Sequence, residues 1–316
     1  MDVLEVKDLK TYFKILRGYV KAVDGVSFEL EKGEALGLAG ESGCGKTTTA
    51  LSILRILPSN GEIKGGKALF NGEDILRMPE KELREKVRWK GISIIFQGAM
   101  NALNPVYKVG DQIIEAMKTH IEMTKEEAKD RTSKLMELVG LEPSRAEGYP
   151  HEFSGGMRQR ALIAMSIACD PDLLIADEPG TALDVIIAAQ ILKLLKELKK
   201  TMNLSMIMIT HDLSIIAETC EKMAIMYAGK IVEYGSVFDI FKEPLHPYTQ
   251  GLIGAFPKIT EERRRMVSIS GSPPDLLNPP PGCRFHPRCK YAMDICKKKE
   301  PEEKMVGNVR VACYLC

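Results

Sequence analysis

The chain has 316 residues, 45% of them hydrophobic, so it can bury one large domain or a domain with a smaller appendage. Its formal net charge of +1 gives no global electrostatic case for nucleic-acid binding, and it has no apolar run long enough to cross a bilayer. The first residues alternate apolar and charged side chains and lack the apolar segment of a secretory signal. We therefore expect an intracellular protein.

Residues 2–39 are expected to form strands and turns. Apolar and polar residues alternate in LEVKDLKTYF and YVKAVDGVSFEL, as they do in half-buried antiparallel strands. The segment ends in a short buried strand, EALGLAG, at residues 34–40.

A glycine-rich stretch, GESGCGKTT at residues 40–48, follows this strand and precedes an expected amphipathic helix at 47–57. Glycine lets backbone N–H groups curl closely around phosphate oxygens, and the helix N-terminus favours anions. Lys46 would supply a cation for the β- and γ-phosphates, and Thr47 a hydroxyl for Mg²⁺. This stretch, the phosphate loop, predicts a nucleotide site formed by Gly40, Ser42, Gly43, Cys44, Gly45, Lys46, Thr47 and Thr48.

Aromatic residues of the preceding strands are candidates for contact with the base. Phe13 or Tyr12 could stack on an adenine, with Tyr19 less favoured. Each of them is equally compatible with an ordinary strand aromatic.

A polar residue ends the next buried strand. A Gly- and Asn-rich segment (58–75) indicates turns and a short hairpin, and a charged helix (78–90) leads to the strand GISIIF (91–96). This strand stops at Gln97, at what is usually the ligand edge of a parallel sheet. A polar residue there is often a simple cap, but Gln97 could also contact Mg²⁺ or an attacking water.

Residues 106–150 carry apolar side chains at helical spacing, which predicts helices with charged outer faces. The stretch FSGGMRQR at 153–160 then opens another helix. A Ser-Gly-Gly at a helix N-terminus can bind a second anion, although a plain serine N-cap accounts for it equally well. The candidates are Ser154, Gly155 and Gly156.

Two acids end the apolar strand PDLLIADEP. Asp177 is placed to hold Mg²⁺ through water, and Glu178 to orient or deprotonate a hydrolytic water. A helix cap or a solvated turn is the alternative for such a pair. Another buried strand, at 203–210, leads to His211, a candidate γ-phosphate contact.

Cysteines gather near the end of the chain. Eight cysteines in an intracellular protein are not expected to form structural disulfides. The spacing C-x5-C-x6-C-x16-C is wider than in usual zinc sites and suits four thiolates that arrive from separate loops. A metal cluster, zinc or free thiols remain open for Cys283, Cys289, Cys296 and Cys313, with Cys316 as a spare. The others are expected to be packing thiols: Cys44, Cys169 and Cys220.

The order of these motifs resembles the ATP-binding subunit of ABC transporters over residues 1 to about 240. The resemblance rests on GESGCGKTT, Gln97, SGGMRQR, LLIADEP, ALD and His211. It implies an α/β fold: a P-loop NTPase (RecA-like) core with an antiparallel β subdomain and a helical signature subdomain, at about 98–160. It also implies an ATPase that uses Mg²⁺, with Glu178, His211 and Gln97 as catalytic residues.

In this family two ATPase domains pair head to tail. The resemblance implies that ATP held by Lys46 of one chain is closed over by residues 154–156 of the other, and that hydrolysis reopens the pair. Gly180 and Phe153 depart from the family's usual Thr and Leu, and we expect only local effects.

Two C-terminal stretches, at 245–257 and 271–289, resemble the loop-rich extension of the oligopeptide and dipeptide importer subfamily, which here spans 241–316. The resemblance implies ATP-driven import of di- or oligopeptides or related solutes. The implied partners are a second ABC ATPase subunit, two membrane-spanning permease subunits and an extracytoplasmic solute-binding protein, with no nucleic acid. The implied location is the cytoplasmic face of the membrane.

Members of this subfamily with the same cysteine pattern carry a [4Fe–4S] cluster. The resemblance therefore implies such a cluster, with zinc less favoured, at Cys283, Cys289, Cys296 and Cys313.

The alternative function is a soluble ABC-type ATPase that acts on nucleic acid or ribosomes. It predicts two tandem ATPase domains or a long coiled-coil insertion before the signature, and this chain has one phosphate loop and a short interval. A redox protein with a regulatory nucleotide site is disfavoured because Glu178 and His211 are both present.

Overall fold

The computed structural model describes residues 2–98, 102–255 and 269–316, which divide into two compact units. The helical unit contains residues 31–34 and 77–209, and the strand-rich unit contains residues 2–30, 35–76 and 210–316. Part of the loop that follows Gln97 and the end of the 245–257 stretch lie outside the described residues.

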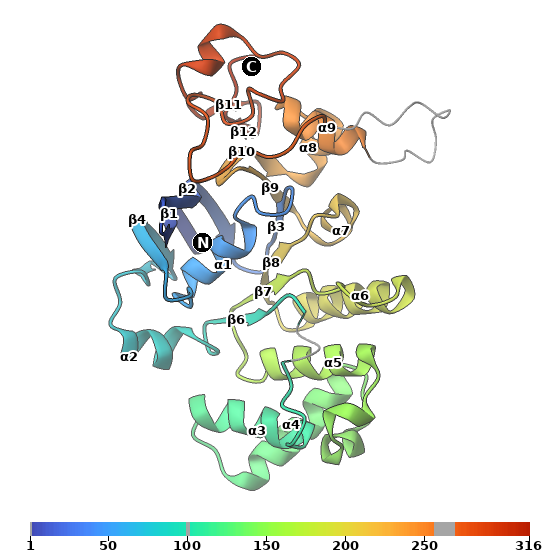
Figure 1. Ribbon diagram of the computed structural model, residues 1–316. Helices are drawn as coiled ribbons and strands as arrows, with labels where there is room; N and C mark the ends of the chain where they lie inside the picture. Colours follow the sequence, from blue (N-terminus) through green and yellow to red (C-terminus); the bar gives the residue numbers. More distant parts are fainter. Residues whose placement is uncertain (1, 99–101, 256–268) are drawn as a thin grey trace. The chain divides into compact units, whose positions relative to one another are not determined.

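The strand-rich unit begins with a four-stranded sheet in the order β2-β1-β4-β5 (Figure 1). The strands are β1 (Asp2–Ile15), β2 (Gly18–Glu31), β4 (Gly61–Phe70) and β5 (Glu73–Asp74). The first two were predicted from their alternation of apolar and polar residues.

The length of β4 departs from the turns and short hairpin predicted for 58–75. β4 is a ten-residue strand that pairs antiparallel with β1. The register of this pairing shifts on either side of Lys10. Near this shift Gly66 has φ +95°, and a Cβ on Gly66 would lie 2.5 Å from the carbonyl oxygen of Asp8. The glycines thus serve an irregular strand pair rather than surface turns.

A second group of strands in this unit is mixed in direction. β3 (Ala35–Ala39) is parallel to β9 (Lys222–Tyr227), which is antiparallel to β10 (Lys230–Ser236). The last residues of the chain add β12 (Val309–Val311) to β10, and β11 (Lys304–Val306) to β12. The extension, predicted to be rich in loops, therefore also contributes two short strands.

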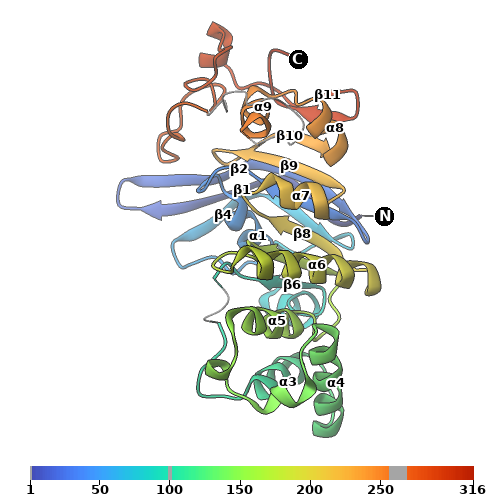
Figure 2. The same ribbon diagram turned by 90° about the vertical axis from the view of Figure 1, so that its right-hand side faces the viewer.

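Four α-helices accompany these strands among the described residues: α1 (Lys46–Ile53), α7 (Leu213–Thr219), α8 (Val237–Lys242) and α9 (Pro247–Gly254). α1 is shorter than predicted, and Arg55 just beyond it has φ +53°, a conformation outside the helix. α7 packs on β3, where a Cβ on Gly37 would lie 2.4 Å from Ile216. Figure 2 shows α7 next to β9, the strand that pairs with β3.

Parallel strands form the centre of the helical unit. β7 (Leu173–Asp177) pairs with β6 (Ile92–Ile95) and with β8 (Ser205–Ile209), and every residue of β7 is buried. Because parallel strands share their carboxyl-terminal edge, the residues that follow β6 and β7 emerge on the same side.

The helices of this unit are α3 (Val109–His120), α4 (Lys125–Leu138), α5 (Gly155–Ser166) and α6 (Val185–Thr201). The charged segment 78–90 forms a short α2 (Glu80–Glu82) and a π-helical turn, Leu83–Val87. Single 3₁₀ turns follow α4 at Pro143–Glu147 and Pro150–Glu152. α3, α4 and α5 pack on one another and appear in green in Figure 1. These helices correspond to the predicted helical subdomain.

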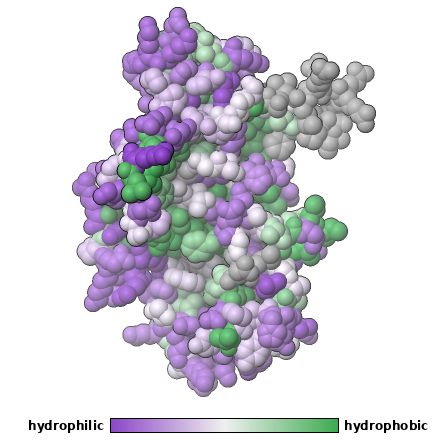
Figure 3. Space-filling view, viewed as in Figure 1, coloured by the Kyte–Doolittle hydropathy of each residue, from purple (hydrophilic) through white to green (hydrophobic). Residues whose placement is uncertain are grey.

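The visible surface is largely hydrophilic, with hydrophobic residues gathered in small groups (Figure 3). Val185 and Ile186, at the start of α6, are among the most exposed large hydrophobic residues. Within the described ranges, no helix combines the length and apolar character that a bilayer crossing requires.

Candidate functional site

The glycine-rich stretch forms a loop between β3 and α1, as predicted. Lys46 is the first residue of α1 and is only 6% exposed. Its Nζ donates hydrogen bonds to the carbonyl oxygens of Gly40 at 2.7 Å and Glu41 at 3.1 Å. A cation is therefore held by the loop backbone at the start of a helix, which is the combination that binds phosphate groups.

Two loop glycines are required because neighbouring backbone carbonyls leave no room for a side chain. Gly40 has φ +147°, and a Cβ there would lie 2.2 Å from the carbonyl oxygen of Met226. Gly45 has φ +107°, and its Cβ would lie 2.3 Å from the carbonyl oxygen of Ala22. Gly43 has φ +78°, but no protein atom lies within 4 Å of its Cβ position. Gly43 thus adjoins open space that a bound anion can use.

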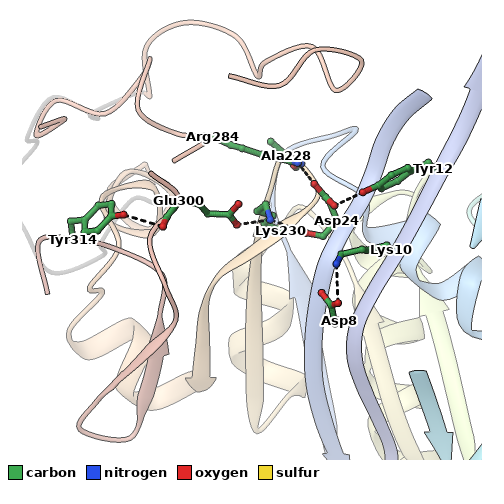
Figure 4. Close-up of polar contacts among 9 residues, drawn as sticks. All are labelled: Asp8, Lys10, Tyr12, Asp24, Ala228, Lys230, Arg284, Glu300 and Tyr314. Carbon is green, nitrogen blue, oxygen red and sulfur yellow. Dashed lines mark hydrogen bonds and ion pairs between the residues drawn. The ribbon is translucent and has the colours of Figure 1, made fainter. Parts of the chain in front are cut away.

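The aromatic candidates have different environments. The Tyr12 hydroxyl donates to Asp24 Oδ1 at 2.6 Å (Figure 4), and burial together with this hydrogen bond raises the pKa of Tyr12 to about 12. Phe13 is half-buried in β1. Tyr19 is exposed and has Lys64 Nζ 4.3 Å from its ring centroid. Base stacking by one of these rings stays a prediction.

Glu178, just after β7, has an uncommon left-handed backbone conformation with φ +46°. Its N–H donates to the carbonyl oxygen of Ile209 at 2.8 Å. Its Oε2 accepts hydrogen bonds from Gln97 Nε2 at 3.0 Å and Thr181 Oγ1 at 2.9 Å. Non-glycine residues in such conformations concentrate at functional sites. The structure therefore brings together two predicted catalytic residues, Gln97 and Glu178, and orients the carboxylate.

Asp177 is the last residue of β7 and is 1% exposed. Oxygen donors of this kind are the ligands that Mg²⁺ prefers, so the chemistry of Asp177 and Gln97 fits the predicted ion.

Ser154 is the N-cap of α5, and its Oγ accepts a hydrogen bond from Met157 N at 3.3 Å. The serine cap considered for this motif is therefore present, and an anion site at the same helix end stays a prediction. Gly156 also has a packing role, because a Cβ there would lie 2.7 Å from Ile187 Cγ2.

His211 belongs to the strand-rich unit and is exposed. The backbone beside it is fixed: Thr210 is 3% exposed, and Asp212 N donates to Thr210 Oγ1 at 3.0 Å. An exposed imidazole on a fixed backbone can contact a phosphate. The strand-rich unit thus carries the phosphate loop and His211, and the helical unit carries Gln97, Ser154, Gly155, Gly156, Asp177 and Glu178.

Two family models match the sequence. The model described as ABC transporter matches residues 23–181. The model described as oligopeptide/dipeptide transporter, C-terminal region, matches residues 232–296. The chain belongs to the ABC transporter family. The predicted family, the predicted cassette fold and the predicted ABC-type ATPase are thereby confirmed.

Curated relatives match this ABC protein along almost its whole length. The oligopeptide transport ATP-binding protein OppD of Escherichia coli (strain K12) is 48% identical over 314 residues, which cover 99% of this chain and 93% of the relative. The dipeptide transport ATP-binding protein DppD of Bacillus subtilis (strain 168) is 46% identical over 317 residues, which cover 99% and 94%.

Solved structures support the cassette fold. The structure of cbiO1 from Clostridium perfringens, part of the ABC transporter complex cbiONQ, has a TM-score of 0.66 at 26% identity, covering 77% of this chain and 91% of that chain. A dimeric ATP-binding cassette in a post-hydrolysis state, bound to ADP and Pi, has a TM-score of 0.65 at 24% identity, covering 74% and 98%.

The [4Fe–4S] cluster predicted for this ABC protein is wrong, and so is its zinc alternative. Among the described residues, no group of three or more His, Cys, Asp or Glu side chains is arranged to hold a metal ion. The four predicted ligands do line one cavity, but its volume is about 10 Å³, no more than the space of one water. These four are Cys283, Cys289, Cys296 and Cys313.

The environment of these thiols gives the physical reason. Burial raises the pKa of Cys283 to about 11 and also raises the pKa of Cys289. For these two thiols, burial therefore opposes formation of the thiolate, which is the form that binds a metal. The remaining predicted packing thiols, Cys44, Cys169 and Cys220, are buried as expected.

Four residues that hold the phosphate loop in place were missed by sequence reasoning. They are Glu41 of the loop itself and Tyr248, Arg284 and Arg288 of the C-terminal part. Glu41 lies within the loop motif, where we assigned it no role. The available signal in the C-terminal part was the pair of arginines in GCRFHPRC, a stretch without an acidic residue.

Proposed function

We propose that this chain binds MgATP and hydrolyses it to power the import of di- or oligopeptides through a membrane complex. The observation that carries the catalytic part is the Glu178 carboxylate, which Gln97 and Thr181 hold at the end of β7. The cargo rests on the relatives, since proteins at 48% and 46% identity are named as oligopeptide and dipeptide transport ATP-binding proteins.

ATP binding is assigned to the phosphate loop. When a nucleotide is bound, Lys46 Nζ would donate charge-assisted hydrogen bonds to phosphate oxygens, which are stronger than bonds to neutral acceptors. Phe13 is our choice for base stacking, because the hydroxyl of Tyr12 is engaged with Asp24 and the ring of Tyr19 with Lys64. The phosphate contacts come from Gly40, Ser42, Gly43, Cys44, Gly45, Lys46, Thr47 and Thr48.

Hydrolysis is assigned to Glu178, which orients the attacking water or accepts its proton. Mg²⁺, when bound, neutralises charge on the phosphates, and the oxygens of Thr47, Asp177 and Gln97 are the donors that would hold it. His211 would contact the γ-phosphate. These roles follow the order of the family's motifs.

The proposal includes a second ATPase subunit, identical or related, whose Ser154, Gly155 and Gly156 close over the nucleotide of this chain. The ATP-binding domain would span 1–240, with a helical subdomain at 98–160, and the extension would span 241–316. The other partners are two permease subunits and, indirectly, an extracytoplasmic solute-binding protein. Their assembly would place this chain at the cytoplasmic face of the membrane.

The test is uptake of a labelled dipeptide and a labelled hexapeptide into proteoliposomes that contain the chain with its membrane subunits and binding protein. We expect uptake only when ATP is supplied on the side of this chain. Glu178→Gln should bind MgATP but hydrolyse it at least about 100-fold more slowly, because a general base is lost. The matched control, Glu197→Gln on the exposed face of α6, should keep both activities.

Two outcomes would contradict this function. Hydrolysis by Glu178→Gln at the parent rate would remove Glu178 from the chemistry. Stimulation of ATP hydrolysis by nucleic acid, with none by the peptide-loaded binding protein, would replace the peptide cargo with the alternative function.

A further inference from the structure

Glu41, the second residue of the phosphate loop, is fixed at all of its polar groups. Its N–H donates to the Tyr248 hydroxyl at 3.0 Å. Its carboxylate accepts two hydrogen bonds from Arg288, from Nη1 to Oε2 at 2.8 Å and from Nη2 to Oε1 at 3.0 Å. Its carbonyl oxygen accepts from Lys46 Nζ at 3.1 Å. Two of these three partners come from the C-terminal tail, residues 241–316.

The tail holds Arg288 firmly before it reaches Glu41. The Arg288 side chain is 6% exposed, its Nε donates to the carbonyl oxygen of Ser270 at 2.9 Å, and its guanidinium lies 5.7 Å from the ring centroid of Tyr227. Burial lowers the pKa of Arg288, but hydrogen bonds to Glu41 and Tyr227 raise it by more. Arg288 is therefore a fixed cation whose planar group matches the carboxylate in two-point geometry.

Tyr248 is equally constrained, because it belongs to a buried aromatic cluster. Its ring centroid lies 4.6 Å from that of Tyr227 and 5.4 Å from that of Phe285, and Tyr227 and Phe285 are 5.1 Å apart. All three side chains are at most 3% exposed. Such packing leaves the Tyr248 hydroxyl little freedom to move away from Glu41.

A second arginine of the same tail segment supports the loop through the turn between β9 and β10. Arg284 donates to the carbonyl oxygen of Ala228 and pairs with Asp24 (Figure 4). The next residue of that turn, Gly229, donates its N–H to the carbonyl oxygen of Cys44 at 2.9 Å. The segment 283–289 therefore supports the phosphate loop at two points, directly at Glu41 and through one turn at Cys44.

We infer that Arg288 and Tyr248 are positioning residues of the nucleotide site, supplied by the C-terminal tail and acting through Glu41. They fix the carbonyl oxygen that holds Lys46. Arg288 also neutralises a carboxylate that would otherwise repel the phosphates of an incoming nucleotide, since like charges at short range are unfavourable. The inference rests on the proposed ATP site and assigns the tail a role in binding at that site.

The test measures the dissociation constant of MgATP, the KM for ATP and kcat for the full chain. Arg288→Gln leaves the Glu41 carboxylate without its cation, and we expect ATP affinity to fall about tenfold while kcat at saturating ATP changes less than about twofold. Arg288→Lys keeps the charge but not the paired hydrogen bonds, and its affinity should be intermediate. The double variant Glu41→Gln with Arg288→Gln should recover most of the affinity, because the repulsive charge is removed.

Arg310→Gln is the matched control. Arg310 is also a tail arginine, with a hydrogen bond to the carbonyl oxygen of Ser27 at 2.7 Å and a ring contact with Tyr234 at 4.5 Å, but these partners lie outside the phosphate loop. Melting temperatures without nucleotide show whether each variant folds, and Arg288→Lys replaces Arg288→Gln if the latter does not.

Two outcomes would overturn the inference: equal ATP affinity for Arg288→Gln and Arg310→Gln, or a double variant that binds no better than Arg288→Gln. If the parent chain itself fails to bind ATP, the proposed function fails instead.

Discussion

Glu178 and the phosphate loop are held in place by different parts of the chain. The Glu178 carboxylate contacts Thr181, three residues away, and Gln97 beside it on the neighbouring strand end, both within the helical unit. Glu41 of the phosphate loop is held by Tyr248 and Arg288, which are 207 and 247 residues away in the sequence. The Glu178 carboxylate is thus supported by residues of its own helical unit, and the loop by the C-terminal tail.

This difference separates two kinds of effect. Loss of a neighbour of Glu178 should change the rate of hydrolysis and leave nucleotide affinity and folding almost unchanged. Loss of a tail contact should change the affinity for ATP or the folding stability, because the tail and the loop belong to the same compact unit. The four substitutions that follow test this separation.

The largest effect is expected at the loop itself. Lys46→Ala removes the cation assigned to the β- and γ-phosphates, and we expect the affinity for MgATP to fall about thousandfold, or about 4 kcal/mol. Titration with a fluorescent ATP analogue measures it. The substitution also removes the hydrogen bonds from Lys46 Nζ to two loop carbonyls, so we expect the melting temperature without nucleotide to fall slightly. Affinity within tenfold of the parent would contradict the assignment.

The next effect concerns the buried pair that anchors the tail. The side chains of Arg284 and Asp24 are 7% and 14% exposed, so Arg284→Gln removes the cation that pairs with a mostly buried carboxylate. We expect a loss of about 3 kcal/mol in the free energy of unfolding, measured by urea denaturation at neutral pH. The double variant with Asp24→Asn should regain part of the loss. A double variant less stable than Arg284→Gln would show that the pair is not the cause.

Features determined over a few residues could be predicted from sequence. The alternation in residues 2–31 predicted β1 and β2, and the apolar run before Asp177 predicted β7 with its acidic end. Gln97 was expected at the ligand edge of a parallel sheet, and the structure places it there, within hydrogen-bonding distance of Glu178. In each case, the residues that decide the structure lie inside the motif or follow from the geometry of parallel strands.

Features determined by distant partners could not be predicted. β4 looked like turns because its glycines fit an irregular register with β1, which no local pattern reveals. The cysteine spacing indicated four thiols that converge, and these four do line one cavity, but the described residues form no group that could hold a metal ion. Arg288 and Glu41 meet only through the folded tail, so the sequence alone gives no reason to pair them.

Folding stability should depend on pH through His246, a buried tail residue near Tyr248. His246 is 1% exposed, its Nδ1 accepts a hydrogen bond from Tyr248 N at 3.1 Å, and burial lowers its pKa from 6.5 to about 4. The unfolded chain binds a proton below pH 6.5, but the folded chain does so only near pH 4. Folding stability therefore falls as the pH drops through this window, by about 2 kcal/mol at pH 5.

His246→Asn tests this effect, since an asparagine oxygen can accept the same hydrogen bond and does not titrate. The difference in unfolding free energy between parent and variant should grow in favour of the variant from pH 7.5 to pH 5. Glu233 accepts hydrogen bonds from the backbone N–H groups of Leu245 and His246. It is present in both proteins, so its own contribution to the pH dependence of stability cancels when parent and variant are compared. A constant difference over this range would contradict the burial argument.

The smallest effect is expected at Thr181, and it tests whether Glu178 is supported by residues near it in the helical unit. Thr181→Ala removes a side-chain donor to Glu178 Oε2, an atom to which Gln97 Nε2 also donates. We expect kcat to fall about threefold to tenfold, because loss of one hydrogen bond that orients the carboxylate costs about 1 kcal/mol.

Thr181→Ser keeps the hydroxyl and should retain the parent rate. Thr201→Ala is the matched control, since that hydroxyl bonds to a carbonyl of its own helix. ATP affinity and melting temperature should not change in any of the three. If Thr181→Ala weakened ATP binding as strongly as it slowed hydrolysis, the support of Glu178 would not be separable from that of the nucleotide, and the contrast between the two regions would fail.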